Sequence, residues 1–84
     1  MSRREKLTQR LLNRPRDFTW DELTGLLKGL GYEAVKPGKS GGSRRRFVHK
    51  TAPPITLHKP HPGNIVKRYV IDDVIGVLRQ EELI

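Results

Sequence analysis

The sequence lacks cysteine entirely, and none of its apolar runs is long enough to cross a membrane. The absence of cysteine excludes disulfide scaffolds and thiolate metal sites. The absence of a long apolar run argues against a membrane span and a secretory signal, so the expected location is the cytoplasm. With 84 residues the chain has room for one compact domain, which excludes solenoids and barrel enzymes. The expected organisation is a single domain over residues 1–84.

Aromatic and cofactor-binding signals are also scarce. Aromatic residues make up 6% of the chain, too few for the base-stacking sheet of an RNA-recognition motif. Tyr69 is expected to pack half-buried on the last helix, with stacking on a base as the alternative. The segment PGKSGGS at residues 37–43 lacks the spacing of a phosphate-binding loop and precedes a predicted strand rather than a helix. His58 and His61 have no carboxylate near them in the sequence, as a metal site would need. We therefore expect no small-molecule cofactor and no metal.

Acidic residues are missing from the middle of the chain. No Asp or Glu occurs between Glu33 and Asp72, whereas the net charge of the whole chain is +8. A segment with many cations and no acids indicates a functional basic surface, with solubility as the alternative explanation. A polyanion, above all nucleic acid, is the expected partner of such a surface. The nine cations of this segment are Lys36, Lys39, Arg44, Arg45, Arg46, Lys50, Lys59, Lys67 and Arg68.

Apolar residues spaced three and four apart predict helices on both sides of this basic segment. Thr19 and Glu22 have the spacing of a capping box at the start of the second helix, and Gly31 is placed to end it. The predicted helices cover residues 2–13, residues 19–30 and the chain from about residue 66 onward.

Three short segments between the helices predict strands, at residues 32–36, 44–50 and 55–58. The order α-α-β-β-β-α predicts an α+β fold in two layers, with a three-stranded antiparallel sheet and helices on one face of it. The other face of the sheet is then open to solvent.

The alternation of side chains along each strand predicts which residues lie on that open face. Phe47, Ile55 and Leu57 are the apolar residues that should point to the core. His49 shares the Phe47 side of its strand and is expected at the edge of the core. The residues expected on the open face are Arg44, Arg46, Thr56 and His58.

His58 is the candidate for proton transfer on this face, because imidazole titrates near neutral pH. Its other interpretations are a surface histidine that contacts RNA and a structural histidine. His61, which is followed by Pro62 and Gly63, is expected mainly to shape the corner after the third strand.

Four segments together resemble the HicA family of toxins from bacterial toxin–antitoxin systems. They are FTWDELTGLLKGLGYE at 18–33, GGSRRRF at 41–47, ITLHKPHPG at 55–63 and VIDDVIGVLRQEELI at 70–84. The resemblance covers residues 18–84 and leaves residues 1–17 as an added N-terminal helix. It implies a small double-stranded-RNA-binding-like domain, the activity of an mRNA interferase that cuts RNA without metal, and a HicB antitoxin as partner.

The chain departs from the family's usual Gly-Ser-His motif, whose histidine the resemblance implies to be catalytic. Here Gly42 and Ser43 are followed by Arg44. A guanidinium does not serve as a general base at neutral pH, although it can stabilise negative charge on a phosphorane. Three explanations are open: the activity is lost and RNA binding is kept, His58 has taken over, or the site has a different geometry.

The leading hypothesis is an RNA-binding toxin and metal-independent endoribonuclease, in which His58 is the base and Arg44 stabilises the developing charge. The residues expected to bind RNA are Lys36, Lys39, Ser43, Arg44, Arg46 and Lys59. Two alternatives belong to other classes: a non-catalytic RNA-binding module, and a basic protein-interaction module that docks an acidic partner.

Overall fold

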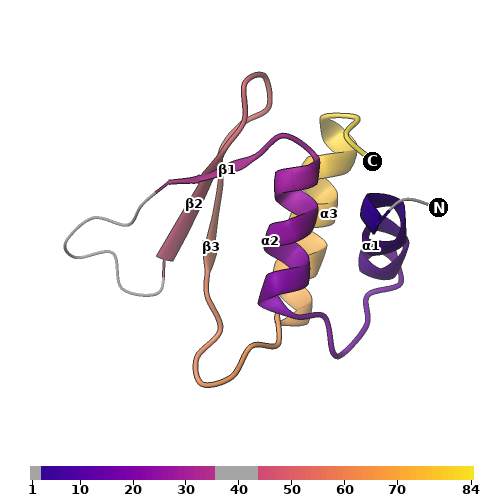
Figure 1. Ribbon diagram of the computed structural model, residues 1–84, viewed down its shortest axis with the longest axis vertical. Coiled ribbons are helices and arrows are strands. Elements are labelled where there is room, and N and C mark those ends of the chain that lie inside the picture. Colours follow the sequence, from indigo (N-terminus) through magenta and orange to yellow (C-terminus); the bar gives the residue numbers. More distant parts are fainter. Residues whose placement is uncertain (1–2, 36–43) are drawn as a thin grey trace.

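The structure is a computed structural model that describes residues 3–35 and 44–84. Three helices and three strands follow one another in the predicted order α-α-β-β-β-α (Figure 1). Their bounds are α1 Arg3–Leu12, α2 Trp20–Gly29, β1 Glu33–Val35, β2 Arg44–Val48, β3 Ile55–His58 and α3 Arg68–Gln80. The α+β fold with a three-stranded antiparallel sheet is therefore confirmed.

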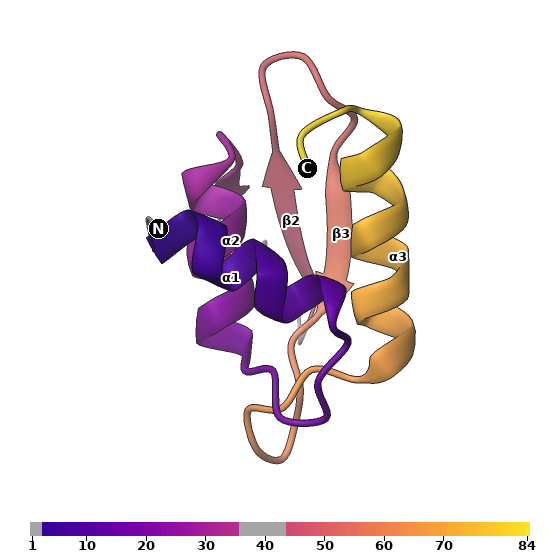
Figure 2. The same cartoon turned by 90° about the vertical axis from the view of Figure 1, so that its right-hand side faces the viewer.

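The helices lie on one side of the sheet, as predicted, but they form two layers there rather than one. Helices α2 and α3 cover the sheet, and α1 packs on the far side of that helix pair (Figures 1 and 2). Leu11 of α1 is fully buried in the common core, with Leu7 and Leu12 partly buried beside it. The apolar stripe of α1 thus meets the outer surfaces of α2 and α3, which makes the molecule three layers thick instead of the expected two.

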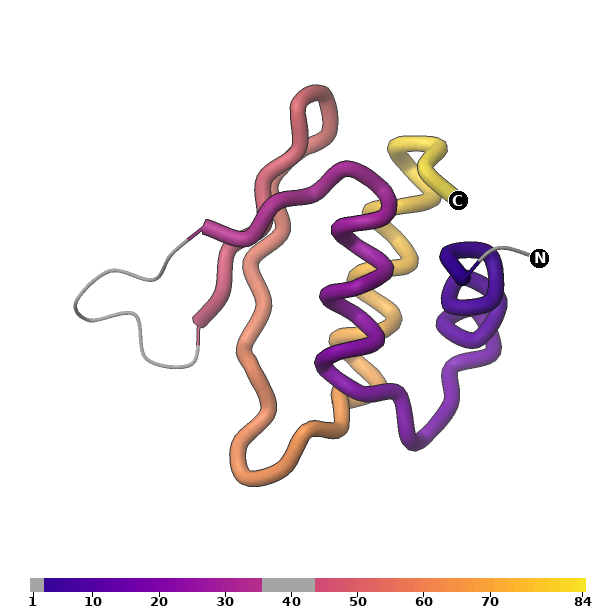
Figure 3. Tube along the Cα trace, viewed as in Figure 1, coloured from indigo at the N-terminus to yellow at the C-terminus, as the bar shows by residue number. Residues whose placement is uncertain are grey.

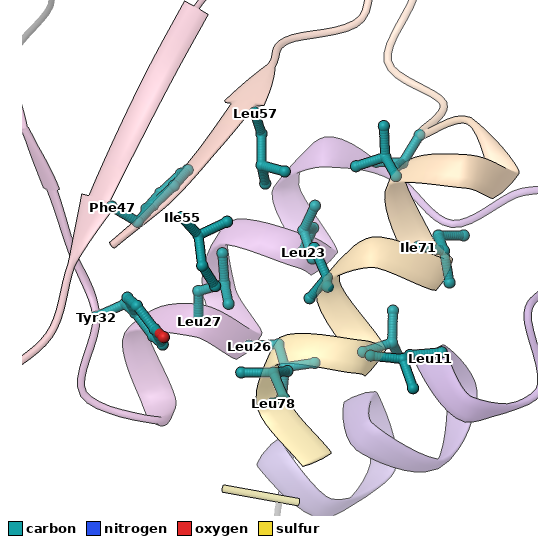
Figure 4. Close-up of a cluster of buried hydrophobic side chains, with 14 of the residues drawn as sticks. Leu11, Leu23, Leu26, Leu27, Tyr32, Phe47, Ile55, Leu57, Ile71 and Leu78 are labelled. Atoms are coloured by element: carbon teal, nitrogen blue, oxygen red, sulfur yellow. The ribbon is translucent and has the colours of Figure 1, made fainter. Parts of the chain in front are cut away.

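The core lies between the sheet and the α2–α3 pair (Figure 4). Phe47, Ile55 and Leu57 contribute the sheet side of this core, as the alternation predicts. The Trp20 ring lies 6.1 Å from the Phe47 ring, centroid to centroid, which joins the start of α2 to the central strand. The helical side is supplied by Leu23, Leu26, Leu27, Ile71, Val74, Ile75 and Leu78.

The predicted capping box at the start of α2 is confirmed. The Glu22 N–H donates to Thr19 Oγ1 at 3.1 Å, and the Thr19 N–H donates to Glu22 Oε1 at 3.1 Å. Arg10 Nε of α1 also donates to Glu22 Oε2, at 2.7 Å. This hydrogen bond from Arg10 and those from Thr19 hold the pKa of Glu22 below its ordinary value, against the opposing effect of burial.

Glu22→Gln is expected to lower the stability of the protein by about 1 kcal/mol at neutral pH, because the cap and the ion pair with Arg10 are weakened. The lowered pKa means that the ionised carboxylate stabilises the fold fully above its unfolded-state pKa of about 4.3, and that this contribution is lost as the pH falls through the folded-state value. Urea unfolding of both proteins at about pH 7 and about pH 3 checks this.

The exposed Asp73 of α3, which forms no ion pair with any described residue, provides the matched control as Asp73→Asn. A stability difference between Glu22→Gln and the parent that stays constant down to about pH 3 would contradict the assignment, because a protonated Glu22 should behave much like Gln.

His49 joins the end of α2 to the turn after β2. Its Nε2 lies 3.0 Å from the Leu30 carbonyl oxygen, and its Nδ1 accepts from the backbone N–H groups of Thr51 and Ala52, each at 3.1 Å. Because Nδ1 accepts both amide hydrogens, Nε2 carries the proton and donates to Leu30. His49 is thus a structural residue at the core edge, as expected.

Gly31→Ala is expected to destabilise the protein by at least about 1–2 kcal/mol. Gly31 ends α2 with a φ of +102°, and a Cβ at this position would lie 2.9 Å from His49 Nε2. The denaturation midpoint in urea measures the effect.

Gly25 supplies the control for that measurement. It lies inside α2, and a Cβ there would meet nothing within 4 Å. Gly25→Ala should therefore stabilise the protein by about 0.5–1 kcal/mol. A Gly31→Ala protein as stable as the parent would show that the chain can reshape the contact with His49 at no cost.

Candidate functional site

The predicted open face of the sheet is present. Arg44 of β2 lies directly opposite His58 of β3, and Arg46 lies opposite Thr56. Residues opposite each other in an antiparallel pair share one face, with Cβ atoms about 4.5–5.5 Å apart. All four side chains are exposed, whereas Phe47, which follows Arg46 in β2, is buried on the helical side. The structure therefore brings two cations and an imidazole together on the face turned away from α2 and α3 (Figure 1).

The remaining predicted RNA-binding residues fall into two groups. Lys59 is exposed and directly follows His58 at the end of β3. Lys36, Lys39 and Ser43 lie outside the described residues, as does the predicted turn at 37–42. Of the predicted RNA-binding residues, Arg44, Arg46 and Lys59 are thus placed by the structure.

Arg10 of α1 and Arg14, which follows this helix, have acidic partners, in contrast to the arginines of the sheet face. Arg10 pairs with Asp17 and Glu22 at 3.0 and 2.7 Å, and Arg14 pairs with Asp72 at 2.7 Å. Within residues 3–35 and 44–84, no acid pairs with the side chains of Arg44, Arg46 or Lys59.

Positive charge that is exposed and not neutralised by the protein's own acids is available to an external anion. Arg45, on the opposite side of β2 from Arg44, is only half-exposed and donates to the Arg44 carbonyl oxygen at 3.0 Å. The available positive charge of the described sheet face therefore comes from Arg44, Arg46 and Lys59, while Glu33 of β1, opposite Val48, is an acid on the same face.

A pocket that the sequence did not predict opens at one end of this face. Its volume is about 160 Å³, and it lies between the segment after β3 and the first turn of α3. Its lining residues are His58, Lys59, Pro60, His61, Val66, Lys67, Tyr69 and Val70.

Tyr69 is the clearest correction to the sequence-based predictions. It was expected to pack half-buried on the last helix, but 57% of its surface is exposed at the rim of this pocket. The signal for this was in the sequence, because helical spacing aligns Tyr69 with the exposed Asp72 and Asp73 rather than with the buried Val70.

Figure 3 shows the chain between β3 and α3 passing the start of α2, and two backbone hydrogen bonds join these segments. The Trp20 N–H donates to the Asn64 carbonyl oxygen at 2.8 Å, and the Val66 N–H donates to the Phe18 carbonyl oxygen at 2.8 Å. The chain between β3 and α3 is thereby held against the start of α2, so that His58 and His61 line the same pocket.

The described parts of the chain contain neither a cluster of metal ligands nor a helix that could cross a membrane. In residues 3–35 and 44–84, no three His, Asp or Glu side chains are grouped as metal ligands. None of the helices in these ranges has the length and apolar character needed to cross a membrane.

The fold and the face define a small basic α+β domain with an exposed imidazole among unpaired cations. Residues 20–81 match the family model described as the HicA toxin of bacterial toxin–antitoxin systems. The chain therefore belongs to the HicA toxin family and is the toxin of a toxin–antitoxin system, as the motifs indicate, and its partner is an antitoxin. No curated protein and no solved structure matches the chain.

Proposed function

We propose that this toxin binds RNA and acts as a metal-independent mRNA endoribonuclease. The observation that supports the proposal best is the strand register, which places Arg44 of β2 directly opposite His58 of β3. The cations of this face have no acidic partner within the described residues. A cation that binds phosphate and an imidazole that moves protons are two of the groups that promote cleavage of RNA through its own 2′-hydroxyl.

The RNA backbone would lie across the open face of the sheet. Arg44, Arg46 and Lys59 would contact phosphates, joined by Lys36, Lys39 and Ser43 of the segment outside the described residues. Arginine suits this role because its planar guanidinium donates two parallel hydrogen bonds to one phosphate. Binding of this kind weakens steeply as salt increases, because each contact releases counterions from the RNA.

His58 would take the proton of a ribose 2′-hydroxyl, and the O2′ would attack the adjacent phosphorus. The bond from phosphorus to the 5′-oxygen of the next nucleotide breaks, and that oxygen receives a proton. The products are a 2′,3′-cyclic phosphate and a 5′-hydroxyl end. Arg44 would stabilise the negative charge that develops on the phosphorane.

His61 is a candidate for the general acid in this scheme, and a lysine is the alternative. It lines the same pocket as His58, although the two residues are separated by Lys59 and Pro60 in the chain. Cleavage of this type needs a group that accepts a proton and a group that returns one, and two imidazoles meet that requirement.

The direct test is to incubate the purified toxin with a long mRNA in EDTA and to analyse the ends of any fragments. Fragments that carry cyclic phosphate or 3′-phosphate ends support the proposal. RNA that stays intact after long incubation but shifts on a native gel would replace it with the alternative, a non-catalytic RNA-binding module.

Arg44 is the observation that favours this alternative, because the family's Gly-Ser-His motif is implied to place its catalytic histidine at that position. The variant Arg44→His restores that motif. If the parent protein leaves RNA intact and Arg44→His cuts it, Arg44 marks the loss of an activity that the fold still supports.

The antitoxin partner is proposed to be a HicB-like protein that covers the basic face. Acidic side chains of such a partner would pair with the same arginines that contact RNA, so RNA and antitoxin should compete. If the toxin binds an acidic antitoxin but no RNA, the third interpretation holds, in which the face is a protein-interaction module.

Residues 1–17 are proposed to be an N-terminal extension of a HicA-like core at residues 18–84. The family match begins at residue 20, which supports the division. The extension is nevertheless part of the same hydrophobic core, because Leu11 is fully buried and Arg14 pairs with Asp72 of α3.

A further inference from the structure

The pocket at the start of α3 combines two kinds of surface. The buried side chains of Val66 and Val70 give it an apolar floor. Lys59 and Lys67 lie among its lining residues, together with the imidazoles of His58 and His61, and no carboxylate lines it. The pocket is therefore suited to a group with a flat apolar part and an attached negative charge.

The size of the pocket limits the ligand. Its volume of about 160 Å³ lies below the range of about 300–1,000 Å³ that is usual for pockets holding a whole small molecule. It has room for one base or one phosphate group rather than for a complete dinucleotide or cofactor. The natural ligand is therefore one unit of a longer chain that continues over the neighbouring surface.

Tyr69 provides the surface on which a base can stack. More than half of the residue is exposed, and it stands at the rim of the pocket at the second position of α3. Stacking of a nucleobase on an aromatic side chain contributes about 1–3 kcal/mol per base and tolerates any sequence. Lys67, which immediately precedes α3, supplies a cation two residues away.

The pocket is continuous with the basic face through His58, which belongs to both. A strand of RNA that lies over Arg44 and His58 would therefore reach the pocket with a neighbouring nucleotide. The first turn of α3 has neither a side-chain cap nor an acid, and Asp72, the nearest acid of the helix, is paired with Arg14.

From this geometry we infer that the pocket is a subsite for one unpaired nucleotide of single-stranded RNA, with the base stacked on Tyr69 and its phosphate near Lys67. The inference rests on the proposed function, because it places this nucleotide next to the bond that His58 would act on. An A-form duplex keeps its bases stacked inside the helix and cannot offer one to Tyr69. The toxin should therefore select single-stranded over double-stranded RNA.

The test compares binding of a single-stranded oligoribonucleotide, made uncleavable by 2′-O-methyl groups, with binding of an RNA hairpin of equal length. Tyr69→Leu should weaken single-strand binding about 10-fold and leave hairpin binding within about twofold, because only the single strand loses a stacked base. Tyr69→Phe keeps the ring and should bind both like the parent. Equal losses on both RNAs, or no loss on either, would overturn the inference.

Two controls separate the subsite from general effects of the surface. Ile65→Ala removes another exposed apolar side chain, outside the pocket lining, and should change neither affinity. Lys67→Gln should reduce binding of the single strand more than Lys50→Gln does, because Lys50 is exposed at the opposite end of β3, in the turn before it. Equal losses from the two lysine variants would count against a local phosphate contact.

A second measurement distinguishes failure of the subsite from failure of the proposed function. Uridine 3′-monophosphate and adenosine 3′-monophosphate are titrated into the full-length toxin while the ring resonances of Tyr69, His58 and His61 are followed by NMR. Saturable shifts of these three residues support the subsite even if long RNA is neither bound nor cut. If RNA is bound and cut but these resonances stay unchanged, the proposed function stands and the subsite is excluded.

Discussion

Replacing His58 by alanine is expected to lower the rate of RNA cleavage in EDTA by about 10²–10⁴-fold, the usual contribution of a positioned general base. His58 is the histidine that the strand register places directly opposite Arg44. Both ring nitrogens of His49 are hydrogen-bonded to backbone groups of Leu30, Thr51 and Ala52, so this ring is not available for the role. The rate is measured on a single-site RNA substrate with the variant and the parent at equal, saturating concentration.

Thr56→Ala is the matched control, because Thr56 shares the exposed face with His58 and carries no proton-transfer group. It should cut at nearly the parent rate. Both variants change exposed positions, so their unfolding free energies should stay within about 0.5 kcal/mol of the parent. A His58→Ala protein that is folded and cuts RNA at the parent rate would eliminate His58 as the base.

The second large effect is expected for the double variant Arg44→Gln/Arg46→Gln. This variant should bind RNA more weakly than the parent, and its RNA affinity should depend less on the salt concentration. Each phosphate contact contributes about 0.7–0.9 to the slope of log affinity against log salt concentration. Removal of two contacts should therefore lower the slope by about 1.4–1.8. If the double variant and the parent bind RNA equally near 1 M salt, the variant should bind roughly 25–60-fold more weakly than the parent at about 0.1 M salt.

The double variant Lys6→Gln/Lys28→Gln removes the same total charge from exposed positions on α1 and α2. If the sheet face holds the RNA, this control should change the slope by much less. Fluorescence anisotropy with a labelled RNA at several salt concentrations gives both slopes. Equal losses from the two double variants would mean that the net charge of the toxin, rather than the sheet face, governs binding.

The sequence predicted those parts of the structure that depend on neighbours in the chain. The capping box of Thr19 and Glu22 is a local pattern, and alternation along β2 and β3 gave the correct face for Arg44 and His58. The second strand is shorter than predicted and ends at Val48, because His49 turns its ring toward Leu30 at the end of α2. No local pattern encodes that contact.

The layer formed by α1 and the pocket beside Tyr69 depend on contacts between distant segments. An apolar stripe with Leu7, Leu11 and Leu12 shows that a helix has a buried side but not what covers it. The pocket exists because the segment after β3 is hydrogen-bonded to the backbone at the start of α2. The Trp20 N–H donates to the Asn64 carbonyl oxygen at 2.8 Å. The sequence therefore predicted the basic face, and base stacking as an alternative role of Tyr69, but not the pocket beside this residue.

The position of α3 also has a consequence for the synthesis of the toxin. This last helix supplies Ile71, Val74, Ile75 and Leu78 to a core that it shares with α2 and the sheet, and it also contacts α1. A nascent chain that has not yet reached residue 68 carries Arg44, Arg46 and His58 but lacks the helix against which the sheet is packed. The basic face therefore acquires its shape only when translation has passed α3, and products interrupted earlier contain the residues of the toxin without its surface.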